Sequence, residues 1–289
     1  MLRSLAIALV LVFPALAQAR PVTIIQSESH GGPAAPLTER LWNTMDLESL
    51  MPILRDEAVA EAEDMQADLF KRGGTGGWLD QVARIHDPDR LESLFREGLE
   101  AARENADRGR IEDALTFYRS DLGRRLVGLE NSARRTMLDA DAEAAAREAL
   151  SAAAARDDPR VARIRRLIDE AQLIGPNVAG GMNAAMAFSE GFAEGEGFDM
   201  PMNAERMLRD TWRQEEEIRA QTTEWMESYL LLAYSPLSDA DLDRYIVFAG
   251  SAGGKALSGL MFAGFDAVFR KTSYELGLTA AGQMRGRQL

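Results

Sequence analysis

FYRSDLGRRL, residues 117–126, and FAGSAGGKAL, residues 248–257, are the two stretches that indicate the fold. Both follow the pattern F-x-x-S-x-x-G-[RK]-x-L, at a displacement of 131 residues. A pattern that recurs at such a distance predicts two copies of one structural unit. The shared positions are Phe117, Ser120, Gly123 and Leu126 in the first copy and Phe248, Ser251, Gly254 and Leu257 in the second.

Apolar residues continue on both sides of each motif at alternating steps of three and four, over residues 111–137 and 242–268. A continuous stripe of this kind is typical of a helix with one face packed against a neighbour. We therefore expect each motif to lie inside a single helix. There the glycine would let another backbone approach closely, and the serine would donate to the carbonyl one turn back, which satisfies it without a catalytic partner.

The glycines of residues 250–257 also suggest a phosphate-binding loop. Their spacing is one residue short of the P-loop pattern, and Lys255 is followed by Ala256 where that pattern has a metal-binding hydroxyl. The first copy lacks the glycine richness. Several glycines in one helix cost about 5 kcal/mol relative to alanine, and buried aromatic residues would have to offset them. The sequence thus predicts a central helix, enclosed by other helices or by a second copy of the chain in a homodimer.

Helical periodicity covers nearly all the remaining chain, and no alternating strand pattern occurs. We expect a first helical pair over residues 38–72 with a break at Met51-Pro52, and a helix capped by Asp87. Alanine, glutamate and arginine dominate residues 136–157, which predicts a long helical connector. The predicted class is all-α: a multi-helix bundle built from two related helical halves joined by this Ala-rich helix.

The N-terminus has the layout of a cleavable secretory signal. Arg3 precedes an apolar run from Leu5 to Ala17, and small residues stand three and one positions before the expected cleavage after Ala19. The run is shorter than the ~20 residues of a transmembrane helix, so we expect a periplasmic protein without an integral membrane span. The expected divisions are a signal peptide (1–19), an extended lead-in (20–36), helical repeat one (37–138), the connector (139–158), helical repeat two (159–277) and a C-terminal tail (278–289).

Composition argues against several kinds of site. The formal net charge of −13 disfavours binding to nucleic acid. Without cysteine the chain has neither a disulfide nor a thiolate. His30 and His86 are the only histidines, and neither is accompanied by a second ligand at helical spacing. We therefore predict no catalytic residue, no metal and no cofactor, and we interpret His86 as structural or solvated.

The motif stretches resemble a known family. FYRSDLGRRL, and SPLSDADLDRYIVFAGSAGGKAL from Ser235 onward, are similar to the signature of the bacterial exported domain-of-unknown-function family 2059. That family is all-helical and carries F-Y-x-S-x-x-G in a helix preceded by an acidic N-cap segment. The second copy departs from it at Ala249, where tyrosine is usual. The resemblance implies the fold and the compartment, and it implies no activity or catalytic residue.

These features predict an exported, non-catalytic helical protein that binds another protein or an envelope component. Arginine forks suit the carboxylates of such a partner, although they can equally pair with the chain's own acids. Two alternatives stay open. A carboxylate-dependent envelope hydrolase would use acids such as Glu215–Glu217, and a peripheral lipid-associated protein would use the apolar residues of 182–198. The predicted partner-binding residues are Arg119, Arg124, Arg125, Arg134 and Arg135.

Overall fold

The computed structural model describes residues 35–69, 77–198, 200 and 202–285. These residues form helices and no strand, so the all-α prediction is confirmed. One short 3-10 segment, η2, spans Arg103–Asn105. In chain order the α-helices are α1 (Leu37–Thr44), α2 (Leu47–Leu69), α3 (Trp78–Ile85), α4 (Pro88–Ala102), α5 (Arg108–Tyr118), α6 (Asp121–Thr136), α7 (Ala140–Ala154), α8 (Pro159–Glu170), α9 (Ile174–Glu194), α10 (Ala204–Trp212), α11 (Glu215–Tyr234), α12 (Asp239–Ala249) and α13 (Ala252–Arg285).

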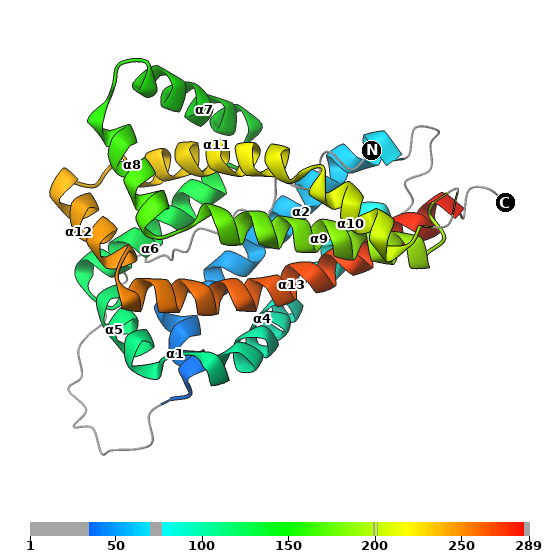
Figure 1. Ribbon diagram of the computed structural model, residues 1–289, viewed down its shortest axis with the longest axis horizontal. Helices are drawn as coiled ribbons and strands as arrows, with labels where there is room; N and C mark the ends of the chain where they lie inside the picture. The colour runs from blue at the N-terminus through cyan, green and yellow to red at the C-terminus, as the bar shows by residue number, and fades with distance from the viewer. Residues whose placement is uncertain (1–34, 70–76, 199, 201, 286–289) are drawn as a thin grey trace.

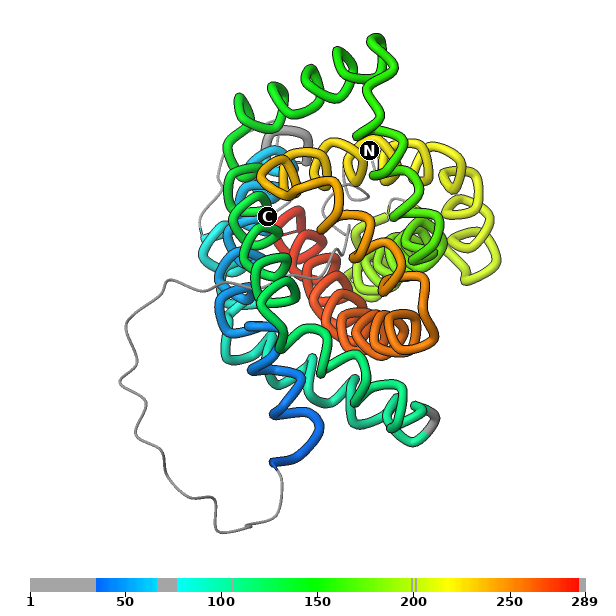
Figure 2. Tube along the Cα trace, turned by 90° about the vertical axis from the view of Figure 1, so that its left-hand side faces the viewer, coloured from blue at the N-terminus to red at the C-terminus, as the bar shows by residue number. Residues whose placement is uncertain are grey.

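The long helix α13 runs through the middle of the molecule. Helix α9 lies along one side of it, and α4 and α5 lie along others (Figures 1 and 2). Its residues Leu257, Met261, Phe265 and Val268 are buried. The expectation of a central helix is thus confirmed, with the enclosing helices supplied by the same chain. The helix continues to Arg285, past the boundary that we expected at residue 278.

Glycines bring α9 and α13 into backbone contact. A Cβ atom at Gly191 of α9 would clash with the carbonyl oxygen of Tyr274 on α13. One at Gly277 of α13 would clash with the carbonyl oxygen of Phe188 on α9. Only a residue without a side chain permits this approach.

Two apolar clusters form most of the core. The larger one draws on residues from both predicted halves, and the rings of Phe95 and Phe265 lie 4.6 Å apart within it. The smaller one lies where α2, α3, α9 and α13 meet and contains Trp78, Phe188 and Phe192. Phe188 and Phe192 belong to the segment proposed for lipid contact. Their burial means that this part of the segment packs inside the molecule.

Several helix ends follow from local sequence. Asp87 caps α4, as expected, and Asp158 caps α8; each is followed by a proline in the first turn of its helix. The predicted break at Met51-Pro52 is wrong, because Pro52 lies inside α2. Pro52 and Glu48 are both exposed, so the Glu48 carbonyl that lacks an amide donor lies on the water side of the helix. The break occurs instead at Asp46, which has a φ of 43°.

Some predicted features fall outside this description. The signal peptide and most of the lead-in lie in residues 1–34, and the end of the first helical pair, expected at residue 72, lies in residues 70–76. Within the described residues, no single helix meets the length and hydropathy of a membrane span; α12 and α13 meet them only as a pair, with a 73° bend between them.

Candidate functional site

Each repeated motif forms a corner between two helices, so the expectation that it lies inside one helix is wrong. The first corner separates α5 from α6, and the second separates α12 from α13. The side chain of Ser120 accepts from the amide of Gly123 at 3.1 Å, and that of Ser251 accepts from the amide of Gly254 at 3.1 Å. These serines act as N-caps and do not donate to a carbonyl one turn back.

The motif glycines let each corner close tightly. A Cβ atom at Gly123 would clash with the carbonyl oxygen of Phe117, and one at Gly254 would clash with that of Phe248. The predicted close backbone approach is therefore present, but the other backbone is the end of the preceding helix. Each corner needs both its cap and its glycine.

The two corners are in direct contact with each other. The rings of Phe117 and Phe248 stack with centroids 3.6 Å apart and an interplanar angle of 6°. The hydroxyls of Tyr118 and Tyr245 lie 3.5 Å apart beside them. A cavity of about 30 Å³ under this contact has room for a water. The remaining motif residues, Leu126 and Leu257, are buried in the main core.

The five predicted partner-binding arginines do not form one surface. Arg119 lies 3.2 Å from the hydroxyl of Thr44, and Arg125 donates to the carbonyl of Pro236 at 2.6 Å. Their partners belong to the chain itself. Of the others, Arg124 pairs with Asp121, Arg134 is buried, and Arg135 is exposed in the last turn of α6.

The acids proposed for a hydrolase lie on the surface. Glu215–Glu217 form the first turn of α11, where negative charge favours the helix dipole. Glu215 pairs with Arg219 at 2.6 Å. None of the three cavities described in this section is lined by this run of acids.

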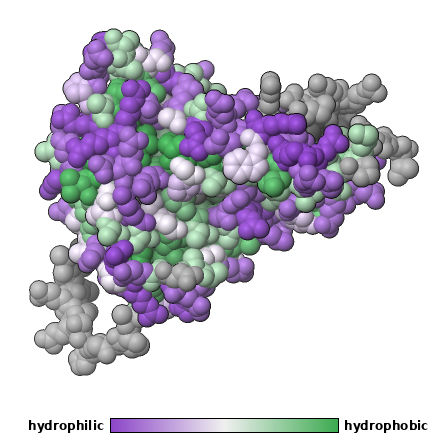
Figure 3. All heavy atoms as spheres, in the orientation of Figure 1, coloured by the Kyte–Doolittle hydropathy of each residue, from purple (hydrophilic) through white to green (hydrophobic). Residues whose placement is uncertain are grey.

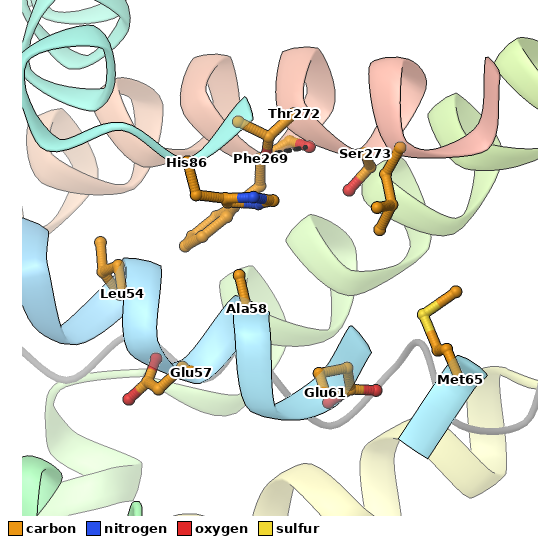
Figure 4. Close-up of a pocket in the computed structure, with 10 residues that line it drawn as sticks. Leu54, Glu57, Ala58, Glu61, Met65, His86, Phe269, Thr272 and Ser273 are labelled. Atoms are coloured by element: carbon orange, nitrogen blue, oxygen red, sulfur yellow. Dashed lines mark hydrogen bonds between the residues drawn. The ribbon is translucent and has the colours of Figure 1, made fainter. Parts of the chain in front are cut away.

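The strongest candidate site is a partly enclosed pocket of about 60 Å³ between α2, the end of α3 and α13 (Figure 4). About 10–15 Å³ of such volume holds one water, so the pocket has room for a small chemical group. Its residues on α2 recur at helical spacing and share one face. The pocket is lined by Leu54, Glu57, Ala58, Glu61 and Met65 of α2, by His86 after α3, and by Phe269, Thr272, Ser273 and Leu276 of α13.

An interior ion pair fixes one of the two acids. The guanidinium of Arg134, 2% exposed, donates to both carboxylate oxygens of Glu57, at 2.6 and 2.8 Å. A fork of this kind holds a carboxylate in one orientation. Arg134 also lies over the ring of Trp225, 6.0 Å from its centroid. The ion-pair partner of Glu57, Arg134, therefore lies outside the pocket.

The second acid, Glu61, has no such partner. No ion pair or hydrogen bond links it to another side chain in the described part of the chain. Burial, together with the charges of Asp64, Glu143 and Glu57, raises the pKa of Glu61 to about 7. The carboxyl thus changes its charge near neutral pH.

A larger groove of about 260 Å³ lies between α9 and α13, on a face where apolar residues gather amid charged ones (Figure 3). Its polar side chains are already engaged, because Asn183 donates to Asp266 at 2.8 Å and Asn177 donates to the carbonyl of Leu173 at 2.8 Å. We therefore favour the smaller pocket as the site.

Buried polar groups also occur behind the pocket. Glu130 is fully buried on α6 and accepts from the hydroxyl of Tyr234 at 2.5 Å. Its main-chain oxygen accepts from Tyr229 at 3.0 Å. Burial raises the pKa of Glu130 well above its usual value, although the bond from Tyr234 opposes the shift. The second oxygen of this carboxyl has no partner.

Sequence reasoning missed the pocket because its residues are far apart in the chain. One local signal was present: Glu57 and Glu61 interrupt the apolar face formed by Leu54, Ala62 and Met65. His86 is buried, yet its ring also faces the pocket. In the described part of the chain, no group of three or more histidines and acids could hold a metal ion.

The fold and the pocket define an all-α helix bundle with a small site of mixed polarity. No protein-family model, curated protein or solved structure matches the chain. The resemblance to family 2059, and the duplication of the two halves, stay predictions.

Proposed function

We propose that the protein is a non-catalytic binding protein of the bacterial cell envelope, whose ligand occupies the pocket between α2, α3 and α13. The observation that carries this proposal is the hydroxyl of Ser273, which lies at the pocket wall and makes no hydrogen bond with another described residue. A few polar groups at the wall of a small pocket commonly orient what it binds, and this hydroxyl is available to a ligand at this position.

The test is native mass spectrometry of the full chain after incubation with a small-molecule extract of cells. The Ser273→Leu variant places a branched apolar group in the pocket, and the exposed Glu63→Gln variant on α2 serves as the control. We expect the unmodified chain and the control to retain a ligand that Ser273→Leu loses, with circular dichroism showing that all three are folded. Retention by Ser273→Leu, or no retained ligand at all, would contradict the proposal.

The envelope location rests on the signal-like N-terminus and on the resemblance to family 2059. N-terminal sequencing of the protein from periplasmic extracts should begin at Arg20. A chain that keeps Met1, or that stays in the cytoplasmic fraction, would contradict this part of the proposal.

A second candidate is a carboxylate-dependent hydrolase, and one observation favours it. Glu57 is ion-paired with Arg134, whereas the pKa of Glu61, in the same pocket, is raised to about 7 by burial. Acid–base catalysis often uses two acids with contrasting environments. Turnover of esters, peptides, glycans or phosphoesters that is lost in Glu61→Gln and kept in Glu63→Gln would favour this candidate over the binding protein.

A further inference from the structure

Two polar groups at the pocket wall indicate the chemistry of its ligand, an inference that rests on the proposed function. His86 and Ser273 line the pocket and are each 8% exposed. Figure 4 shows the imidazole ring and the hydroxyl on the α13 side of the pocket, turned toward each other, above Ala58 of α2. The carboxyl groups of Glu57 and Glu61 extend on the other side of α2 in the same view. The wall that faces α2 is therefore polar without carrying a carboxylate.

His86 presents a hydrogen-bond acceptor to the pocket. Its Nδ1 lies 2.9 Å from the carbonyl oxygen of Val82, and a carbonyl oxygen only accepts, so Nδ1 carries the proton of this bond. Nε2, on the far edge of the ring, makes no hydrogen bond with another described residue. Burial lowers the pKa of His86, which favours the neutral ring. In this tautomer Nε2 is an acceptor that a ligand with an N–H or O–H group can satisfy.

Ser273 adds a group that can both donate and accept. Its neighbour Thr272 donates to the carbonyl of Phe269 at 3.4 Å, as hydroxyls in helices commonly do. Ser273 makes no hydrogen bond with another described residue. A ligand whose donor lies at Nε2 of His86 therefore finds a hydroxyl for its acceptor atom on the same side of the pocket (Figure 4).

The charged groups next to this wall are already paired. Beside His86, Arg90 donates to both carboxylate oxygens of Glu275 at 2.7 Å. On the α2 side, Arg134 holds the carboxylate of Glu57. A charged ligand group at the wall would lose its hydration and meet no opposite charge there. Burying an uncharged group that forms the same hydrogen bonds costs less.

We infer that the pocket binds the uncharged hydroxyl or primary carboxamide group of a small ligand, which donates to Nε2 of His86. Both groups combine a donor with an acceptor, and the acceptor atom can take the hydrogen of Ser273. Leu54, Met65 and Leu276 belong to the apolar part of the lining and suit the alkyl part of such a ligand. A volume of about 60 Å³ limits that part to a few carbon atoms.

Calorimetry on the full chain at pH 8 tests the inference with probes of similar size. 1-Butanol and butanamide carry a donor and an acceptor without charge, methyl propyl ether has an acceptor only, and n-butylamine and butyrate are charged at this pH. We expect 1-butanol or butanamide to bind at least about fivefold more tightly than the other probes, because the ether leaves Nε2 without a donor and the ions lose their hydration. The tighter of the two uncharged donors distinguishes an alcohol from an amide as the ligand.

Variants connect the binding to the pocket wall. Ser273→Ala removes the hydroxyl and should weaken the tighter uncharged probe about fivefold. His86→Phe keeps a ring without Nε2, so it should weaken that probe and remove most of its advantage over methyl propyl ether. Ser151→Ala, at an exposed position of α7, should leave both affinities unchanged. Circular dichroism shows whether each variant is folded, and Ser273→Ala decides the test if His86→Phe is not.

The possible failures are distinguishable. If methyl propyl ether, n-butylamine or butyrate binds as tightly as 1-butanol and butanamide, or if Ser273→Ala has no effect, this inference is wrong while the pocket remains a binding site. If no probe binds, but Ser273→Leu still loses the ligand retained from the extract, only this inference fails. If no probe binds and no ligand is retained, the proposed function fails as well.

Discussion

Gly123 and Gly254 are the residues on which the two corners most depend. A side chain at either position would run into the carbonyl oxygen that ends the preceding helix. Gly123→Ala and Gly254→Ala should each lower the free energy of unfolding by about 1–3 kcal/mol, because the corner must open to make room. Urea denaturation of the full chain measures this loss.

The matched control for these variants is Gly259→Ala. Gly259 lies on α13 beyond the second corner, and a Cβ atom there would have no neighbour within 4 Å. Alanine should raise the free energy of unfolding by up to about 1 kcal/mol through its better helix propensity. Similar effects at all three positions would mean that the corners are not closed as described.

The serines show which part of a corner a sequence can reveal. Ser120 is followed by Asp121, a combination typical of a helix start, yet the apolar stripe continues through the corner. It does so because α5 and α6 both direct their apolar residues, such as Leu115 and Leu126, into the same core. Periodicity therefore predicted the buried face correctly and the helix boundary wrongly.

At the scale of helices, the backbone contact of α9 with α13 is the most sensitive interface. Gly191→Ala or Gly277→Ala would force the two helices apart, since each new methyl group meets a main-chain carbonyl and not a movable side chain. We expect each to lower the free energy of unfolding by about 3 kcal/mol or more. Thermal unfolding followed by circular dichroism provides the measurement.

Gly282→Ala is the control on the same helix. A Cβ atom at Gly282 would meet nothing within 4 Å. The melting temperature of the Gly282→Ala variant should therefore equal that of the unmodified chain or exceed it. If Gly191→Ala had the same melting temperature as Gly282→Ala, the close approach of α9 and α13 would be refuted.

Local sequence predicts helix starts better than it predicts how helices meet. Asp87 and Asp158 were recognisable because a cap followed by proline is a local signal. The break predicted at Pro52 was wrong because a proline normally ends a helix, whereas here the Glu48 carbonyl that loses its amide donor is on the exposed side of α2. The contact between Gly191 and Gly277 depends on segments far apart in the chain, and a pattern of short period does not encode it.

At the scale of the whole molecule, Glu130 should make stability depend on pH. Its folded-state pKa is raised well above the usual 4.5, first of all by burial. The stability linked to its neutral form is fully present below the unfolded pKa and is lost as pH rises toward the folded pKa. Urea unfolding between pH 4 and pH 9 should therefore show a steady decline, and Glu130→Gln should make that decline shallower.

Glu216→Gln, at an exposed position of α11, is the control for this series. It should leave the slope of stability against pH unchanged. A Glu130→Gln variant with the same slope as the unmodified chain would show that the carboxyl is not held in its neutral form. Glu61 should add a smaller decline of the same sign between pH 4.5 and about 7.

The pocket was unpredictable for a reason that belongs to this scale. His86 alone is an isolated histidine, and Ser273 alone is one serine in a helix. They become a site only because α13 passes α2 and the end of α3. The arginine cluster shows the reverse case, since residues close in sequence are separated between the surface and the interior, where Arg134 is buried.

The central position of α13 also has a consequence for how the chain is made. This helix contains 34 residues at the C-terminal end of the described chain, so a ribosome synthesises it after every helix that it contacts. Until then α4, α5 and α9 have no partner for the faces that α13 covers. Apolar surface exposed in this way promotes aggregation. The nascent chain therefore has to stay unfolded, or bound to a chaperone, until its last long segment has been synthesised.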